Sequence, residues 1–72
     1  MFYVITIRDE ETRRFEPVQK FSLQVPQEVE RNTDLAESLG HELAEMGFTT
    51  RMEMWPSESG WPTDQIVYRN IK

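Results

Sequence analysis

Residues 34–46, DLAESLGHELAEM, constrain the fold most, because they combine a helical apolar stripe with a dense set of acids. At about 100° per residue, five apolar side chains fall within one arc of a helical wheel: Leu35, Ala36, Leu39, Leu43 and Met46. The polar and acidic side chains cover the opposite side. This pattern predicts a surface helix with one buried stripe.

The ends of this helix are signalled by short polar residues and by a glycine. Asn32-Thr33-Asp34 offers a side chain that accepts a hydrogen bond from a free backbone N–H, and Glu37 follows Asp34 by three residues. Gly47 is expected to end the helix, because glycine adopts the left-handed conformation without a Cβ clash. An acidic loop is expected between Pro26 and this start.

The chain's net charge of −5 belongs to one segment. Residues 1–25 hold four acids and four bases, residues 47–72 hold three of each, and residues 26–46 hold six acids against Arg31 alone. One interpretation is a solvated helix face that keeps a small protein soluble. The other is an acidic surface that docks on a basic one.

The length of 72 residues predicts a single domain, 1–72, which buries only about 60 % of its unfolded surface. An enclosed active site has little room in such a domain. The chain has no cysteine, and therefore no disulfide and no thiolate metal site. No apolar run approaches the roughly 20 residues of a membrane span and no signal peptide is recognisable, so a cytoplasmic protein is expected.

Four segments read as strands. Residues 2–8 are apolar at both parities, which indicates a strand buried on both faces. Residues 15–25 alternate, but Pro17 favours an edge or a bulge there. Residues 48–55 alternate again, and residues 65–71 form a last strand.

The resulting order, β-β-α-β-β, predicts a two-layer α+β domain with an antiparallel sheet and one helix packed on one face. The second face would carry one parity of the first strand and Trp55. Either the loop around Trp61 folds over that face, or a partner covers it.

No set of residues suggests chemistry. His41 lies between Glu37 and Glu45 at helical spacing, but the sequence offers no converging partner or additional metal ligand. The serines lack a nucleophile-elbow pattern and the glycines are too scattered to form a phosphate loop. We therefore expect a protein that is not an enzyme and has no catalytic, metal or cofactor site.

Direct nucleic-acid binding is not expected either. FYVITI, residues 2–7, resembles the first-strand motif of the RNA-recognition motif family. That family has a helix directly after this strand and a second aromatic-glycine motif, and both are missing here. The negative net charge also opposes binding to a polyanion.

A line of small residues, Ala36, Gly40 and Ala44, lies beside the leucine stripe. Glycine in the middle of a helix costs about 1 kcal/mol relative to alanine, so a close approach is expected to compensate. The line either sits on the chain's own sheet or receives another helix.

Two surfaces remain as candidate partner-binding sites, and their residues are Asp34, Glu37, His41, Glu42, Glu45, Trp55 and Trp61. Tryptophans often anchor interfaces, and acidic clusters speed docking onto basic grooves. We expect a non-catalytic inhibitor that docks on a larger nucleic-acid-handling complex through glutamates that mimic phosphates. In size, acidity and lack of chemistry the chain resembles phage-encoded inhibitors of host machinery, such as anti-CRISPR proteins or small RNA-polymerase-binding regulators, which implies a host partner with a basic surface. The alternative is a self-associating structural subunit, such as a homodimer.

Overall fold

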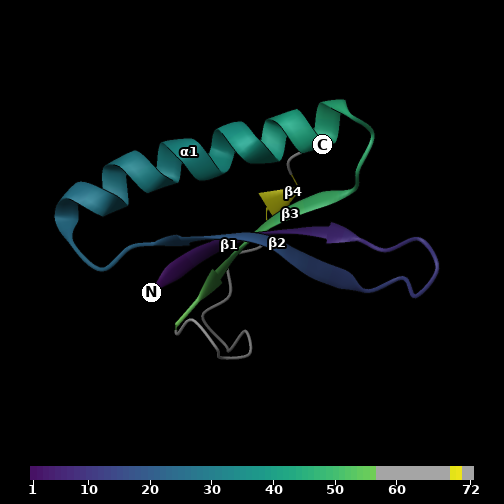
Figure 1. Ribbon diagram of the computed structural model, residues 1–72, viewed down its shortest axis with the longest axis horizontal. Coiled ribbons are helices and arrows are strands. Elements are labelled where there is room, and N and C mark those ends of the chain that lie inside the picture. The colour runs from purple at the N-terminus through teal and green to yellow at the C-terminus, as the bar shows by residue number, and fades with distance from the viewer. Residues whose placement is uncertain (57–68, 71–72) are drawn as a thin grey trace.

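The computed structural model describes residues 1–56 and 69–70 of the chain. One helix packs on one face of an antiparallel sheet (Figure 1). In chain order the elements are β1 (Phe2–Arg8), β2 (Phe15–Ser22), α1 (Pro26–Glu45), β3 (Thr50–Trp55) and the two-residue β4 (Arg69–Asn70). The predicted α+β class, with antiparallel strands and a helix on one face, is confirmed.

β1 is an inner strand of the sheet and is buried on both faces, as its composition predicts. The strand order is β2-β1-β3-β4, and β1 pairs antiparallel with both β2 and β3. Val4 and Ile5 point to opposite faces and are each 0 % exposed. A strand covered on both sides needs apolar residues at both parities, which explains the composition of residues 2–8.

β2 shows the irregularity expected at Pro17. Ile5 pairs with Gln19 and Thr6 with Pro17, so Val18 is an extra residue in β2 at a bulge. The strand is an edge of the sheet in the part of the chain that the structure describes. Because proline cannot donate to a sheet ladder, edge positions and bulges tolerate it best.

The helix begins eight residues earlier than the sequence predicts, and the expected acidic loop is its first two turns. Pro26 occupies the first helical position, where its fixed φ suits the helix and its missing N–H is not needed. Asn32 does not cap the helix, because its Nδ2 donates instead to the Ser22 carbonyl oxygen at 2.7 Å.

The cap is provided by Glu28. Its Oε1 accepts hydrogen bonds from the backbone N–H groups of Gln24 and Val25, at 3.2 and 3.3 Å, and from the Ser22 hydroxyl at 3.1 Å. The Val25 bond is half of a capping box, the half in which the third helical residue reaches back to the N-cap backbone. One carboxylate oxygen thus fixes both the end of β2 and the start of α1.

Glu28→Ala is therefore expected to lower the free energy of unfolding by about 1–2 kcal/mol, since a lost cap and unsatisfied donors cost this much. Urea denaturation followed by far-UV circular dichroism measures the change. Glu30→Ala is the matched control, because Glu30 is an exposed acid two residues later on the same helix. An equal loss in both variants would show that the carboxylate of Glu28 does not cap α1.

Gly47 ends the helix as predicted, with a φ of +100°. Its N–H donates to the Ala44 carbonyl at 3.0 Å, and the Phe48 N–H donates to the Leu43 carbonyl at 3.1 Å. This pair of bonds is a Schellman motif, which requires a left-handed residue after the C-cap. The chain reverses there into β3.

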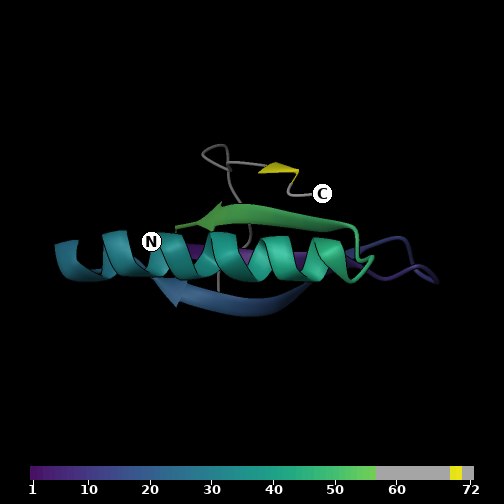
Figure 2. The same ribbon diagram turned by 90° about the horizontal axis from the view of Figure 1, so that it is seen from above.

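The core lies between α1 and the sheet (Figure 2). Ile5, Ala36 and Met52 form its buried centre, and four half-buried side chains pack against it: Tyr3, Phe21, Leu39 and Leu43. Gly40 is also buried, one turn after Ala36. These positions favour the interpretation that the line of small residues sits on the chain's own sheet.

The predicted buried stripe is only partly buried. Leu35 is 49 % exposed and Met46 is 70 % exposed. The line that faces the sheet runs through Ala36 and Gly40, which leaves Leu35 on the flank of the helix, and Met46 lies at the C-cap. The predicted stripe centres on the leucines, whereas the small residues Ala36 and Gly40 are the ones that allow close contact with the sheet.

β3 begins at Thr50 and shows the predicted alternation. Met52 faces the helix, while Arg51 and Trp55 lie on the other face of the sheet. Of the predicted last strand, only Arg69–Asn70 falls within the described residues, and it pairs with Met52 and Arg51 of β3. Among the described residues, no helix is long and apolar enough to cross a membrane.

Candidate functional site

The outer side of α1, turned away from the sheet, carries most of the predicted site residues. Asp34, His41, Glu42 and Glu45 are exposed, and Glu37 is half-buried. Their helix holds six acids against Arg31 alone, a sum of −5 that equals the net charge of the chain. The structure therefore brings these five predicted residues onto one element. We call the acids on this side, Glu30, Asp34, Glu37, Glu42 and Glu45, the outer acidic face.

The correction at the start of the helix adds Glu30 to this surface. The sequence predicts a loop at Glu30, so Glu30 is not among the predicted site residues. Fifteen residues separate Glu30 from Glu45, which at a rise of about 1.5 Å per residue puts them about 22 Å apart along the axis. The sequence signal was Pro26 followed by acids in the first helical turns, a common helix start.

The exposed members of the outer acidic face are not neutralised within the described part of the chain. Glu30, Asp34, Glu42 and Glu45 make no side-chain hydrogen bond or ion pair with the described residues, and neither does His41 beside them. The ion pair seen there joins Arg8 and Glu10, in the β1–β2 region, at 3.3 Å. Carboxylates arranged this way repel one another and favour an approaching positive charge.

Trp55 lies on the opposite side of the sheet from the outer acidic face. Its Nε1 donates to Glu53 Oε1 at 3.1 Å, and the Lys20 ammonium lies 5.0 Å from its ring centroid. A second cation–aromatic contact on the same face places the Arg51 guanidinium 3.7 Å from the centroid of the Phe15 ring. Both contacts join β2 to β3 across β1, since these strands flank it.

Glu53 is the residue on this reverse face that sequence reasoning missed. It is only 5 % exposed, and its Oε2 accepts a hydrogen bond from the buried Thr6 hydroxyl at 3.2 Å. Together with the Trp55 bond, both carboxylate oxygens have donors. The alternation of residues 50–55 puts Glu53 beside Trp55, but nothing in the pattern signals its burial.

The predicted anchors and the predicted acids are thus not one continuous surface. Trp55 and the outer acidic face are separated by the sheet and the helix core, and Trp61 lies outside the described residues. A partner that binds the acids of α1 would not touch Trp55 without wrapping around the domain. The role of the two tryptophans in binding stays a prediction.

Neither surface shows the geometry of a catalytic or metal centre. Across residues 1–56 and 69–70, no group of three His, Asp or Glu side chains is arranged to hold a metal ion. His41 is exposed on a convex helix, whereas a general base needs a substrate held within hydrogen-bond reach. What the outer acidic face can do chemically is attract and bind cations.

Comparison of the chain with protein-family models, curated proteins and solved structures finds no match.

Proposed function

We propose that the protein is a small, non-catalytic binding protein that docks on a basic surface of a larger protein complex and blocks or remodels it. The outer acidic face of α1 makes the contact. The partner is a nucleic-acid-handling complex, because the basic groove of such a complex binds a row of negative charges. In its size, acidity and lack of catalytic residues, the protein resembles phage-encoded inhibitors of CRISPR effectors or of RNA polymerase as a class.

The observation that carries this proposal is the separation of charge in the described structure. Asp34, Glu42 and Glu45 are exposed on one helix and make no ion pair with the described residues, and Arg31 is the one base of that helix. Lys20 and Arg51 lie on the reverse face over aromatic rings. A face that carries an excess of one charge sign raises the association rate with an oppositely charged surface.

The rigidity of α1 supports the proposal further. Glu28 caps one end, the Schellman motif at Gly47 closes the other, and Ala36 packs into the core between them. Acids four residues apart on such a helix advance about 6 Å along its axis. A pre-ordered row of carboxylates pays little conformational entropy on binding, unlike acids in a flexible loop.

We also propose that the last strand continues beyond Arg69–Asn70 over residues 65–71, completing the β-β-α-β-β order. The β-branched and aromatic residues of this segment, Ile66, Val67, Tyr68 and Ile71, support such a strand. Because β4 pairs with β3 in the sheet, a longer strand there would not cover the outer side of α1.

The test is capture of partners by the tagged full chain from a bacterial lysate at low and high salt, with identification by mass spectrometry. The triple variant Asp34→Asn, Glu42→Gln, Glu45→Gln is expected to keep its fold and to bind the captured partner about tenfold more weakly. This follows because exposed charge pairs contribute about 0.2–1 kcal/mol each. The effect should shrink as salt rises, since salt screens exposed charges.

A pair of single variants controls for net charge. Glu45→Gln and Glu11→Gln each remove one exposed acid, but Glu11 lies in the β1–β2 hairpin and not on α1. Only Glu45→Gln is expected to weaken binding, by about two- to threefold. Equal capture by the wild type and the triple variant would overturn the proposed function.

A further inference from the structure

A groove opens where the β1–β2 hairpin meets the C-terminal end of α1. Its volume is about 480 Å³, and it is lined by Ile7, Arg8, Asp9, Glu10, Glu16, Met46, Gly47 and Phe48. In both ribbon views the hairpin extends past the C-terminal end of α1 (Figures 1 and 2). Pockets that bind small ligands are about 300–1,000 Å³, so the groove has room for one long side chain.

The apolar part of the groove is exposed without covering residues. Met46 is 70 % exposed and Phe48 is 39 % exposed, on either side of the helix-ending Gly47. Ile7 is half-buried at the groove's inner side. Large apolar side chains that are grouped and surrounded by polar residues mark binding sites more often than scattered ones do.

The charges around this apolar part are mainly negative. Asp9, Glu10 and Glu16 stand against Arg8, whose Nε lies 3.3 Å from Glu10 Oε1. Asp9 Oδ1 accepts the Glu11 N–H at 2.8 Å and so is committed to the hairpin turn. Glu16 is exposed and makes no side-chain hydrogen bond or ion pair with the described residues, which leaves it as the available carboxylate.

The end of α1 adds to this negative potential. A helix C-terminus carries about half a negative charge, and bases normally offset it. The last turn of α1 has no base, and Glu42 and Glu45 lie near it instead. Helix end and hairpin acids thus favour a cation at the same place.

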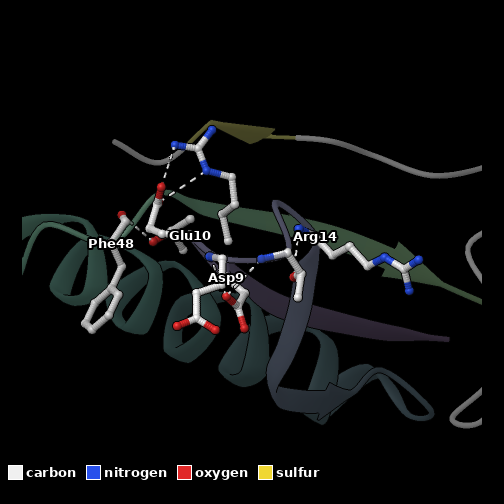
Figure 3. A network of polar contacts seen from close by, with 8 residues as sticks. Asp9, Glu10, Arg14 and Phe48 are labelled. Carbon is white, nitrogen blue, oxygen red and sulfur yellow. Dashed lines mark hydrogen bonds and ion pairs between the residues drawn. The ribbon is translucent and has the colours of Figure 1, made fainter.

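Figure 3 shows this end of the molecule. Asp9, Glu10 and Phe48 lie there on neighbouring segments, and the Arg14 side chain extends away from them. The Arg13 N–H donates to the Asp9 carbonyl at 2.7 Å and the Asp9 N–H to the Arg14 carbonyl at 2.8 Å, which fixes the hairpin loop. The cation that the site favours is therefore not supplied by Arg14 of the same hairpin.

We infer that this groove binds an arginine side chain of the partner protein. The inference rests on the proposed function and names the contact that gives it specificity. The arginine methylenes lie on Met46 and Ile7, and the guanidinium reaches Glu16 and the Phe48 ring. Arginine suits this site better than lysine, because its planar guanidinium pairs with carboxylates in a fork and stacks on aromatic rings.

The groove adjoins the outer acidic face. Glu42 precedes Met46 by four residues, and residues at this spacing are neighbours on a helix surface. A partner lying along the C-terminal half of α1 therefore reaches the groove without leaving the surface. The acids attract the partner, and the groove selects one side chain within it.

The test is a titration of the ¹⁵N-labelled full chain with Nα-acetyl-arginine N-methylamide, followed by amide chemical shifts. Acetyl-citrulline N-methylamide is the matched probe, since it has nearly the same shape and no charge. We expect saturable shifts confined to residues 7–10, 16 and 46–48 with the arginine probe and none with citrulline. Equal shifts with both probes, or shifts spread evenly over α1, would overturn the inference.

Two variants sharpen the titration. Glu16→Gln is expected to weaken binding of the arginine probe about tenfold, because a charged hydrogen bond becomes neutral. Glu30→Gln removes the same charge from the far end of α1 and is expected to leave probe binding unchanged. An equal loss in both variants would mean that the probe senses only the net charge, and would contradict a built site.

The same variants separate this inference from the proposed function. The triple variant of the outer acidic face should still bind the arginine probe in the groove and lose less affinity than Glu16→Gln does, because Glu42 and Glu45 lie near the groove but do not line it. If the wild type binds the arginine probe but the triple variant still binds the partner with full affinity, the docking face is wrong and the groove stands. If the triple variant loses partner binding but the wild type does not bind the arginine probe, the groove is wrong and the docking face stands. If sedimentation instead shows self-association that Glu16→Gln abolishes, the occupant is an arginine of a second copy, and the partner assignment is wrong.

Discussion

Ile5→Ala is expected to lower the free energy of unfolding by about 2–5 kcal/mol, as buried isoleucines truncated to alanine typically do. Ile5 is fully buried on the helix-facing side of the central strand, against Ala36 and Met52. β1 is held by strands on both sides, so the backbone cannot close the cavity. At about 0.05–0.15 kcal/mol per residue, a domain of this size has only about 4–11 kcal/mol of stability. Urea denaturation followed by circular dichroism measures the change.

Val18→Ala controls for the loss of a β-branched residue in the same sheet. Val18 is the bulged residue of edge strand β2 and is largely exposed. Its truncation is expected to cost less than about 0.5 kcal/mol, as exposed substitutions usually do. Comparable losses at both positions would mean that the helix-facing core does not dominate stability.

The strands were predictable because their patterns are local. Apolar residues at both parities predicted that β1 is buried on both faces. Pro17 predicted an irregularity in β2, and the alternation of residues 50–55 placed Met52 and Trp55 on opposite faces of the sheet. These signals depend on two local properties, the two-residue period of side chains in a strand and the missing N–H of proline. Neither property depends on which strands are neighbours in the sheet.

The start of α1 was not predictable from the same kind of pattern. Pro26 both ends an extended segment and suits the first helical position, so the proline alone does not decide between a loop and a helix start. The deciding contact is the Glu28 carboxylate on Ser22, Gln24 and Val25, which joins helix to strand. The structure shows that the early acids belong to the helix, which lengthens the outer acidic face.

The sequence predicted the acids of the candidate site but not how its parts combine. Apart from Glu30, the outer acidic face follows from helical periodicity. The groove depends on the hairpin reaching the end of α1, and the Lys20–Trp55 contact depends on the order β2-β1-β3. Strand order is a tertiary property, so a helical wheel and an alternation pattern cannot supply it. Met46 and Phe48 around Gly47 were the available signal for the groove.

Glu53→Ala is expected to lower the free energy of unfolding by about 2–4 kcal/mol, because a buried donor left without an acceptor costs about 1–3 kcal/mol. The change removes the acceptor of the Thr6 hydroxyl and of the Trp55 indole together. Glu53→Gln is expected to cost less, since its amide keeps one acceptor oxygen. Urea denaturation of both variants measures the difference.

A double-mutant cycle with Thr6→Val isolates the buried pair. Once Glu53 is alanine, Thr6→Val removes an unsatisfied hydroxyl and should cost less than it does in the wild type, with a coupling energy of about 1 kcal/mol. Strict additivity would mean that the Thr6–Glu53 bond contributes nothing to stability.

A measured coupling between Thr6 and Glu53 would also bear on how the protein binds a partner. The same carboxylate holds the Trp55 indole, so a partner that used Trp55 as an anchor would first have to break that bond, whereas the outer acidic face of α1 can bind without rearrangement.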